Sequence, residues 1–231
     1  MDDINPLPQG DILIHAGDCT NVGKPHEVRE FVEWFMNIKG FDSKIFIAGN
    51  HDWAFQKVNE PHHSGDYDWF HNLINDENLS QSDVTYLEDT NFTIEDPKFS
   101  RPIKIHGSPW QPNFYDWAFN LPRAGEDLQE KWFWIPKETD ILITHGPPQD
   151  HLDVSGPPYN QPHLGCELLR VKVDEQPPKI NVFGHIHGSY GYKFHNGTHF
   201  FNASILNENY RYTNKPITFD WDPETNEINF I

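Results

Sequence analysis

Short runs of apolar, mostly β-branched residues recur along the chain, and each run ends in a glycine or a polar residue. Four or five consecutive apolar residues are typical of a strand that is buried on both faces, as in a sheet covered on each side. The pattern therefore predicts five buried strands, in the segments DILIHAGD (11–18), KIFIAGNHD (44–52), RPIKIHGSPW (101–110), DILITHGPP (140–148) and KINVFGHIHG (179–188).

The segments between these runs predict helices early in the chain and hairpins late. Apolar residues recur at helical spacing over about 25–39, which indicates an amphipathic helix, and weaker helical patterns cover 66–76 and 161–171. Alternating residues on either side of Asn196-Gly197 predict a hairpin, because Asn-Gly favours a tight turn. This order of elements favours stacked sheets with helices on the outside.

Composition favours one globular domain over residues 1–231. The chain is 36% hydrophobic, so it can bury a sizeable core, and no Ser/Gly-rich or charge-block linker divides it. No apolar run is long enough to cross a membrane, and the opening stretch MDDINPLPQG is unlike a signal peptide. Because two cysteines do not suggest a disulfide framework, a cytoplasmic protein is expected.

The charge balance restricts the class of partner. The formal net charge is −18, with 35 acidic and 17 basic residues. Such a surface repels polyanions, so a long nucleic acid is not an expected partner unless bound cations reverse the local sign. A small anionic substrate would likewise need cations at its binding site. The 14 histidines therefore raise the question of which of them converge.

Polar side chains follow four of the predicted strands at the point where each strand ends. The carboxyl ends of strands are where open α/β sheets place their ligand sites. Taken singly, each of these ends is more typical of an ordinary turn, whereas four of them together favour a metal site. The residues are Asp18, Asn50 with His51 and Asp52, His145, and the pair His185 and His187.

These ligand types indicate a class of chemistry. Carboxylate, amide and imidazole donors without thiolate suit Mn²⁺, Fe, Zn²⁺ or Mg²⁺ better than a structural zinc site. Paired divalent ions polarise phosphoryl oxygens, and the water they share becomes a hydroxide nucleophile near neutral pH. His51, next to a ligand but itself free, could protonate the leaving oxygen, with Asp52 orienting the ring.

The motifs GDCT, GNHD, THGPP and GHIHG, in this order, resemble those of the calcineurin-like metallophosphoesterase superfamily. The stretches GDILIHAGD, GSPWQP, AFNLPR and KPITFD are similar to its metallophosphoesterase-domain-containing (MPPED-like) subfamily, and the similarity covers nearly the whole chain. The resemblance implies a four-layer α/β/β/α sandwich of two mixed sheets flanked by helices, with two bound metal ions. It also implies phosphodiesterase activity on cyclic nucleotides and model diesters.

Carried over position by position, the resemblance also implies a role for each site residue. Asp18 would bridge the two metals, and the first metal would be completed by Asn50, His145 and His185. His187 would reach the second metal. In the same way, the resemblance makes His51 the catalytic histidine that contacts the phosphate, with Asp52 as its partner.

One departure from the family pattern concerns the second metal. The family opens with a strand that ends in Asp-x-His, whereas no Asp-x-His precedes Asp18 here. The resemblance therefore implies an N-terminally shortened domain. Tight binding is expected at the site of Asp18, Asn50, His145 and His185, and weak or absent binding at the site that keeps only Asp18 and His187.

The leading hypothesis is a metal-dependent phosphodiesterase, most simply with Mn²⁺, that hydrolyses small phosphodiesters, with cyclic nucleotides as candidate substrates. The alternative is a catalytically impaired metal- or nucleotide-binding protein of the same fold with a defective second site. A protein serine/threonine phosphatase is favoured less, because only the shared metal motifs point to it.

Several other histidines and aromatic residues are expected to have structural roles. His15 is interpreted as a core residue, and His62 and His63 as a solvated pair in a loop. Core packing is favoured for an aromatic cluster after a proline-rich turn, with stacking on a substrate base as the alternative. This cluster comprises Trp110, Phe114, Trp117 and Phe119.

Overall fold

Thirteen strands are found in the residues that the computed structural model describes, which are 7–57, 64–74, 82–156 and 163–231. The pair His62 and His63 lies outside these ranges. The strands are β1 (Ile12–Ala16), β2 (Ser43–Ile47), β3 (Val84–Tyr86), β4 (Thr90–Ile94), β5 (Ile103–Ser108), β6 (Gln111–Pro112), β7 (Asn120–Leu121), β8 (Ile141–Thr144), β9 (Ile180–Phe183), β10 (Gly191–His195), β11 (Thr198–Asn202), β12 (Phe219–Trp221) and β13 (Ile228–Phe230).

Two sheets form the centre of the molecule. The smaller has the order β1-β2-β3, and its strands are parallel. The larger has the order β10-β11-β9-β8-β5-β4 and is mixed, because the outer strands β10 and β4 run antiparallel to their neighbours. Two short pairs, β6-β7 and β12-β13, lie outside these sheets.

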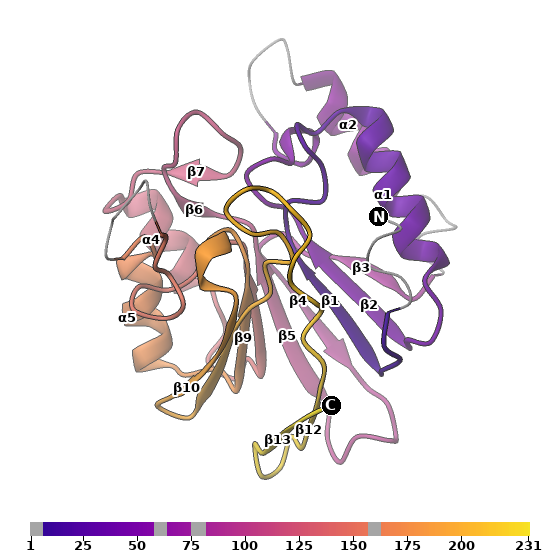
Figure 1. The fold of residues 1–231 in the computed structure, drawn as a ribbon, viewed down its shortest axis with the longest axis vertical. Helices are drawn as coiled ribbons and strands as arrows, with labels where there is room; N and C mark the ends of the chain where they lie inside the picture. Colours follow the sequence, from indigo (N-terminus) through magenta and orange to yellow (C-terminus); the bar gives the residue numbers. More distant parts are fainter. Residues whose placement is uncertain (1–6, 58–63, 75–81, 157–162) are drawn as a thin grey trace.

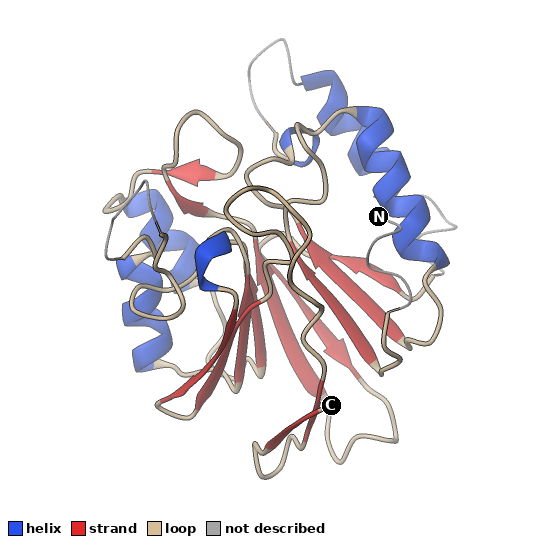
Figure 2. Ribbon diagram, in the orientation of Figure 1, coloured by secondary structure: helices blue, strands red, loops and turns tan. Residues whose placement is uncertain are grey.

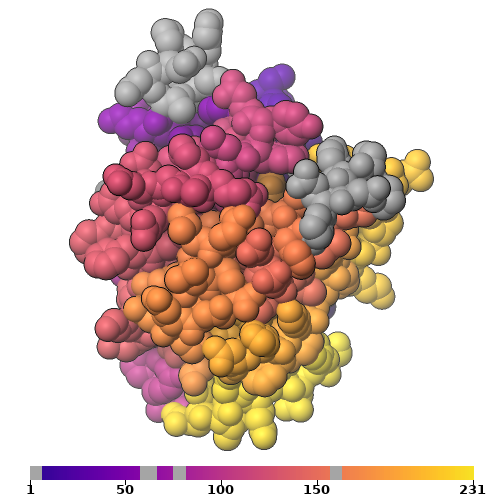
Figure 3. All heavy atoms as spheres, turned by 90° about the vertical axis from the view of Figure 1, so that its left-hand side faces the viewer, coloured from indigo at the N-terminus to yellow at the C-terminus, as the bar shows by residue number. Residues whose placement is uncertain are grey.

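Helices cover the outer face of each sheet, so the expected four-layer α/β/β/α sandwich is confirmed (Figures 1 and 2). Two mixed sheets were expected, but in the described residues only the larger sheet is mixed and the smaller one is parallel. On one side α1 and α2 lie over the smaller sheet, and on the other α4 and α5 pack side by side over the larger sheet. Figure 3 shows this second outer face. The helices are α1 (Pro25–Asn37), α2 (Ser64–Ile74), α4 (Glu126–Phe133) and α5 (Glu167–Glu175), with short 3-10 turns η2 (Trp53–Phe55) and η3 (His187–Ser189).

The continuous apolar runs arise because successive side chains of a strand enter different cores. In β2, Ile45 and Ile47 point into the core between the two sheets, whereas Phe46 points toward α1. In β8, Ile141 and Ile143 lie in that same inter-sheet core, whereas Leu142 points toward α4 and α5. Since a strand exposes alternate residues on opposite faces, a strand covered on both faces must be apolar at every position.

Most of the elements predicted from the pattern are present. The five predicted strands correspond to β1, β2, β5, β8 and β9, and the helix predicted over about 25–39 is α1. The hairpin at Asn196-Gly197 joins β10 to β11, with φ of 49° and 82° at the two turn residues. Of the helix predicted over 66–76, residues 66–74 belong to α2, and 75–76 lie outside the described ranges.

The helix predicted over 161–171 needs a correction. Residues 161–162 are not described, 163–166 are not helical, and α5 begins at Glu167 and continues to Glu175. Cys166 is the N-cap, with its sulfur accepting a hydrogen bond from the backbone N–H of Leu169, and it also forms a parallel bridge with Pro148. The tertiary bridge therefore holds Cys166 in an extended conformation, so the helix begins after it.

None of the helices in the described ranges has both the length and the apolar character needed to cross a membrane.

Lys44 on β2 is buried, and its ammonium group contacts two backbone carbonyls and one carboxylate. Its side chain is 0% exposed, and its Nζ donates to the carbonyls of Met36 (2.8 Å) and Ile38 (3.1 Å) at the end of α1. The same Nζ lies 3.0 Å from Asp83 Oδ1. A cation at this end of a helix also complements the helix dipole.

Lys44→Met is therefore expected to lower the free energy of unfolding by about 2–4 kcal/mol, because it leaves two half-buried carbonyls and one carboxylate without this donor. Urea denaturation followed by circular dichroism measures the change. Lys39→Met, an exposed position just after α1, is the matched control. A loss equal to that of the control would show that the buried ammonium adds nothing to stability.

Candidate metal centre

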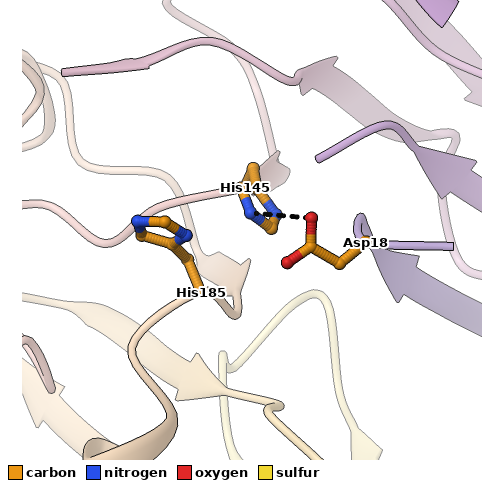
Figure 4. Close-up of side chains that lie close together, drawn as sticks. All are labelled: Asp18, His145 and His185. Carbon is orange, nitrogen blue, oxygen red and sulfur yellow. Dashed lines mark ion pairs between the residues drawn. The ribbon is translucent and has the colours of Figure 1, made fainter. Parts of the chain in front are cut away.

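Four turns at the carboxyl ends of strands bring the predicted ligands together. Asp18 follows β1 and Asn50 follows β2, which are neighbours in the smaller sheet. His145 follows β8 and His185 follows β9, which are neighbours in the larger sheet. Figure 4 shows Asp18, His145 and His185 pointing toward one another from these separate segments.

The donor atoms of this cluster are close enough to share one ion. One ligand atom from each of Asp18, His145 and His185 lies within 4.8 Å of the other two. His145 Nε2 is 3.4 Å from Asp18 Oδ1 and 2.9 Å from Asn50 Oδ1. Donors bound at about 2.1 Å and at right angles around one ion would be about 3 Å apart, so these spacings suit neighbouring ligands of a divalent ion.

The backbone around the cluster is held in conformations that bring it close together. Asp18 and His185 both have positive φ, 57° and 65°, which is unusual for residues with a side chain. At Gly49 a Cβ atom would clash with Asp18 Oδ1 and would lie 2.6 Å from His145 Cε1. Glycine is therefore required at position 49, because any side chain would occupy the space between two ligands.

The electrostatics of His145 favour a cation at this point. His145 Nδ1 donates to the Ala16 carbonyl (2.9 Å), so in the neutral ring Nε2 is a lone pair facing the Asn50 oxygen, another acceptor. Burial opposes the charged ring, but the Asp18 carboxylate outweighs it and raises the pKa of His145. A proton or a metal ion placed among these acceptors would satisfy them, and the carboxylate, amide and imidazole donors fit a divalent metal.

The other two members of the cluster are in the charge states that metal ligation requires. Burial opposes ionisation of Asp18, but the neighbouring His145 outweighs it, so the pKa of this carboxyl lies well below its usual range. Burial, followed by the charge of His145, lowers the pKa of His185 to about 3, so its ring is neutral. An ionised carboxylate and a neutral imidazole are the forms that bind metals.

His187 is near this cluster but is not one of the residues that surround the common point. Its Nδ1 donates to the Asn207 carbonyl (3.1 Å), and its ring packs edge-on against Tyr210. The group of possible ligands found within the described ranges contains Asp18, His145 and His185 without His187. The structure thus gathers the four residues expected at the first metal and leaves His187 at the margin.

His51 lies beside the ligands with its ring held from two directions. Its backbone N–H donates to Asp18 Oδ1 (3.0 Å), and its Nδ1 donates to the Asn21 carbonyl (2.7 Å). The face of the ring packs on Trp117, with ring centroids 4.3 Å apart. Nε2 is therefore the ring atom left to interact with a substrate.

The structure corrects the pairing of Asp52 with His51 that the family resemblance implied. The Asp52 carboxylate instead accepts hydrogen bonds from the backbone N–H groups of Cys19 (3.0 Å), Thr20 (2.9 Å) and Gly49 (2.7 Å), and from the Thr20 hydroxyl (2.7 Å). Asp52 is fully buried. Its carboxylate therefore joins the turn that carries Asp18 to the turn that carries Asn50.

Asp52→Asn is expected to weaken divalent metal binding by about 10–100-fold, the usual effect of losing a group that orients metal ligands. An amide presents an NH₂ group to donors that need an acceptor, so the turns carrying Asp18 and Asn50 would separate. Titration calorimetry with Mn²⁺ measures the affinity, and Asp220→Asn, an exposed position on β12, is the control. Unchanged affinity would show that the two turns hold their positions without this carboxylate.

The aromatic cluster after the proline-rich turn divides between two roles. Trp110 and Phe119 pack on each other in the core region, as expected. Trp117 instead packs on His51, and Phe114, which is 38% exposed, contacts the edge of His185 at 5.4 Å between ring centroids. Two of these aromatic residues therefore contact the candidate site rather than only the core.

Two groups that the sequence did not indicate complete the site. The carbonyl of Asn21 is a backbone group, so no residue type marks its role. Core packing was favoured for Trp117, with stacking on a substrate base as the alternative. Its contact with His51 depends on a tertiary contact, because the N–H of the next residue, Ala118, donates to the Asn50 carbonyl (3.0 Å).

Comparisons with known proteins agree with this arrangement. The model of the calcineurin-like phosphoesterase family matches residues 1–189. Metallophosphoesterase domain-containing protein 1 of Homo sapiens is 42% identical over 223 residues, which cover 93% of this chain and 65% of that protein. UPF0046 protein T07D4.2 of Caenorhabditis elegans is 37% identical over 233 residues, covering 94% of this chain and 56% of its own length.

A solved crystal structure matches the fold with a TM-score of 0.55, covering 96% of this chain and 87% of its own chain at 12% identity. The chain spans less than two thirds of the length of the human relative. The family generally hydrolyses phosphoesters with the help of divalent metals. Since the family model and the relatives both cover most of the sequence, the chain belongs to the calcineurin-like phosphoesterase family.

Proposed function

We propose that this protein is a metal-dependent phosphodiesterase that hydrolyses small phosphodiesters, with cyclic nucleotides as candidate substrates. The observation that supports it most is the convergence of Asp18, Asn50, His145 and His185 on one point, with His51 beside them. These four residues would hold a divalent ion, and Mn²⁺ is the first choice because the donors mix hard oxygen and imidazole nitrogen. When bound, such an ion polarises a phosphoryl oxygen and lowers the pKa of a coordinated water.

The chain's own residues supply orientation and proton transfer. Asp18, fixed by the backbone N–H of His51, would be one of the residues that hold the ion, and its carboxylate would supply negative charge to it. The doubly protonated His51 ring would give the Nε2 proton to the leaving oxygen and keep the Nδ1 proton on the Asn21 carbonyl. General acid catalysis of this kind contributes about 10²–10⁴-fold. Asp52 holds the two turns in register and does not contact His51.

Charge and aromatic residues support a small substrate with a flat group. A formal net charge of −18 repels duplex or long single-stranded nucleic acid. Phe114 beside His185 and the 74% exposed Tyr115 offer aromatic surface at the edge of the site. Stacking on such surface favours a nucleobase or aryl substituent over an alkyl one.

Hydrolysis assays with and without added metal test the proposal. The purified chain is freed of metal with a chelator, reloaded with Mn²⁺, Fe²⁺, Zn²⁺ or Mg²⁺, and assayed on bis(p-nitrophenyl) phosphate and on 2′,3′- and 3′,5′-cyclic AMP. The expected result is turnover of diesters that depends on the added ion. Absence of turnover with every ion, while the metal is bound, would refute a phosphodiesterase.

A second candidate function is supported by the position of His187. Among the described residues, the ligand atoms gather around one point, and His187 is engaged by the Asn207 carbonyl instead. This arrangement would suit a metal- or nucleotide-binding protein with impaired hydrolysis. Elemental analysis separates the two functions: two ions per chain with efficient turnover favours the enzyme, and one ion without turnover favours the binding protein.

A further inference from the structure

We propose that Glu27, a residue of α1 outside the ligand cluster, is a positioning residue for His51. Its carboxylate orders the loop 20–24, and the Asn21 carbonyl in that loop holds the His51 ring. The inference rests on the proposed function, because it assigns Glu27 to the reaction through the residue that would protonate the leaving oxygen.

The contacts form a short chain from the helix to the imidazole. His51 Nδ1 donates to the Asn21 carbonyl at 2.7 Å. The Asn21 side-chain amide donates to Glu27 Oε1 at 3.0 Å, so the same residue that holds the histidine is itself held by the carboxylate. Glu27 Oε2 accepts the backbone N–H groups of Val22 (3.2 Å) and Lys24 (3.0 Å).

These contacts make Glu27 the common acceptor of the loop and of the start of α1. Lys24 is the N-cap of the helix and Glu27 is in its first turn, where a carboxylate is favoured by the unpaired N–H groups and the helix dipole. Burial opposes ionisation of Glu27, but the hydrogen bonds from Lys24, Asn21 and Val22 outweigh it and lower its pKa. The carboxylate is thus charged and fully used in fixing the loop.

The loop is also packed against the turn that follows His51. At Gly23, where φ is +72°, a Cβ atom would lie 2.5 Å from the backbone nitrogen of Trp53 and 2.7 Å from that of Ala54. The N–H of Gly23 donates to the Thr20 hydroxyl (2.9 Å), which in turn donates to Asp52. Because the two segments touch backbone to backbone, a shift of the loop displaces the carbonyl that the imidazole uses.

A second contact that restricts the His51 ring comes from Trp117, whose ring covers the face of the imidazole with an interplanar angle of 32°. A ring stacked on one face and hydrogen-bonded through Nδ1 has one orientation, and once its Nε2 proton has gone to the leaving oxygen the neutral ring keeps one tautomer, with the remaining proton on Nδ1. The partner of Nδ1 is the uncharged carbonyl of Asn21. The charged group that this residue contacts is the Glu27 carboxylate, through the Asn21 side chain. Misplacing a catalytic group by about 1 Å can cost about 100-fold in rate, so an orienting carboxylate has a measurable effect.

Glu27→Gln and Glu27→Ala test the inference, with Glu30→Gln, exposed on the same helix, as the control. Each variant is assayed with Mn²⁺ on bis(p-nitrophenyl) phosphate, which has a good leaving group, and on 2′,3′-cyclic AMP, whose leaving group is a ribose hydroxyl. Loss of a positioned general acid slows the poor leaving group more. For Glu27→Ala we expect kcat to fall about 10–100-fold on the cyclic nucleotide and less than about 5-fold on the aryl diester.

The same experiment separates a positioning role from a structural one. KM, metal content and the midpoint of thermal unfolding are measured for each variant, and Glu27→Gln, which keeps one acceptor oxygen, is expected to be intermediate in kcat. Equal losses on both diesters, or loss of bound metal in step with kcat, would overturn the inference. Wild-type rates in both Glu27 variants would overturn it as well.

A second measurement keeps the inference testable if neither diester is hydrolysed by the wild-type protein. Long-range ¹H–¹⁵N spectra of the histidine side chains report the tautomer of His51. In the wild-type protein the Nδ1–H form is expected, and in Glu27→Ala a mixture of tautomers with a broadened resonance. Absence of turnover with this change observed would refute the proposed phosphodiesterase and leave the positioning contact supported, whereas an unchanged tautomer would overturn the positioning role.

Discussion

Replacing His51 by alanine is expected to lower kcat for 2′,3′-cyclic AMP by about 10²–10⁴-fold, and kcat for bis(p-nitrophenyl) phosphate by less, while the metal content per chain stays the same. The reason is that the imidazole lies beside the ligand cluster without belonging to it, held by the Asn21 carbonyl and by Trp117. Its backbone N–H still donates to Asp18 in the variant, so the ligand turn keeps its contact.

Steady-state kinetics and elemental analysis on the same preparation check this expectation. His195→Ala, at an exposed position on β10, is the control for removal of an imidazole. If His51→Ala loses metal and activity in the same proportion, His51 is a ligand or a structural residue. If neither changes, another group protonates the leaving oxygen.

Replacing His145 by alanine is expected to reduce the affinity for divalent metal by more than about 100-fold, a larger effect than the usual loss of an orienting group. His145 Nε2 is within 3.4 Å of both Asp18 Oδ1 and Asn50 Oδ1, so its removal takes away the central donor of the cluster. The side chain is only 1% exposed, and its loss also removes the donor that it presents to the Ala16 carbonyl.

Calorimetric titration with Mn²⁺ measures this loss, and His145→Asn is included because it retains a polar group in the cavity. The wild-type protein treated with a chelator gives the value for complete metal removal. His199→Ala is the matched control, since His199 is also buried, and its two ring nitrogens contact Tyr192 and Asn226 far along the chain from the ligands. Metal affinity unchanged in His145→Ala would show that the ion binds elsewhere.

The positions of the ligands followed from the sequence because strand ends are determined by local patterns. Asp18, Asn50, His145 and His185 each follow an apolar run, and parallel neighbours bring such ends to one edge of a sheet. Their convergence could therefore be expected before the structure, although their roles as ligands stay predictions. The helix α1 was predictable for a similar reason, since its buried residues recur at helical spacing.

The features that the sequence did not predict depend on tertiary contacts. Asp52 is adjacent to His51 in the chain, but its side chain turns toward the amide of Gly49 in its own turn and the amide of Cys19 in the turn that carries Asp18. The helix α4 buries only Leu128 and Trp132 along two turns, a pattern too short to separate from a loop. Backbone carbonyls such as that of Asn21 are present at every residue, so their use is visible only in three dimensions.

Because the ligands are divided between the two sheets, a bound metal would stabilise the position of one sheet relative to the other. Asp18 and Asn50 lie at the end of one sheet, and His145 and His185 lie at the end of the other. A shared ion would therefore cross-link the two sheets at one end of the apolar core between them. Sliding one sheet over the other would then require breaking coordinate bonds as well as repacking side chains. An ion that binds only the native state adds about 2.7 kcal/mol to its stability at one hundred times Kd. Substitutions in the inter-sheet core, distant from any ligand, would thereby alter metal affinity through the spacing of the sheets.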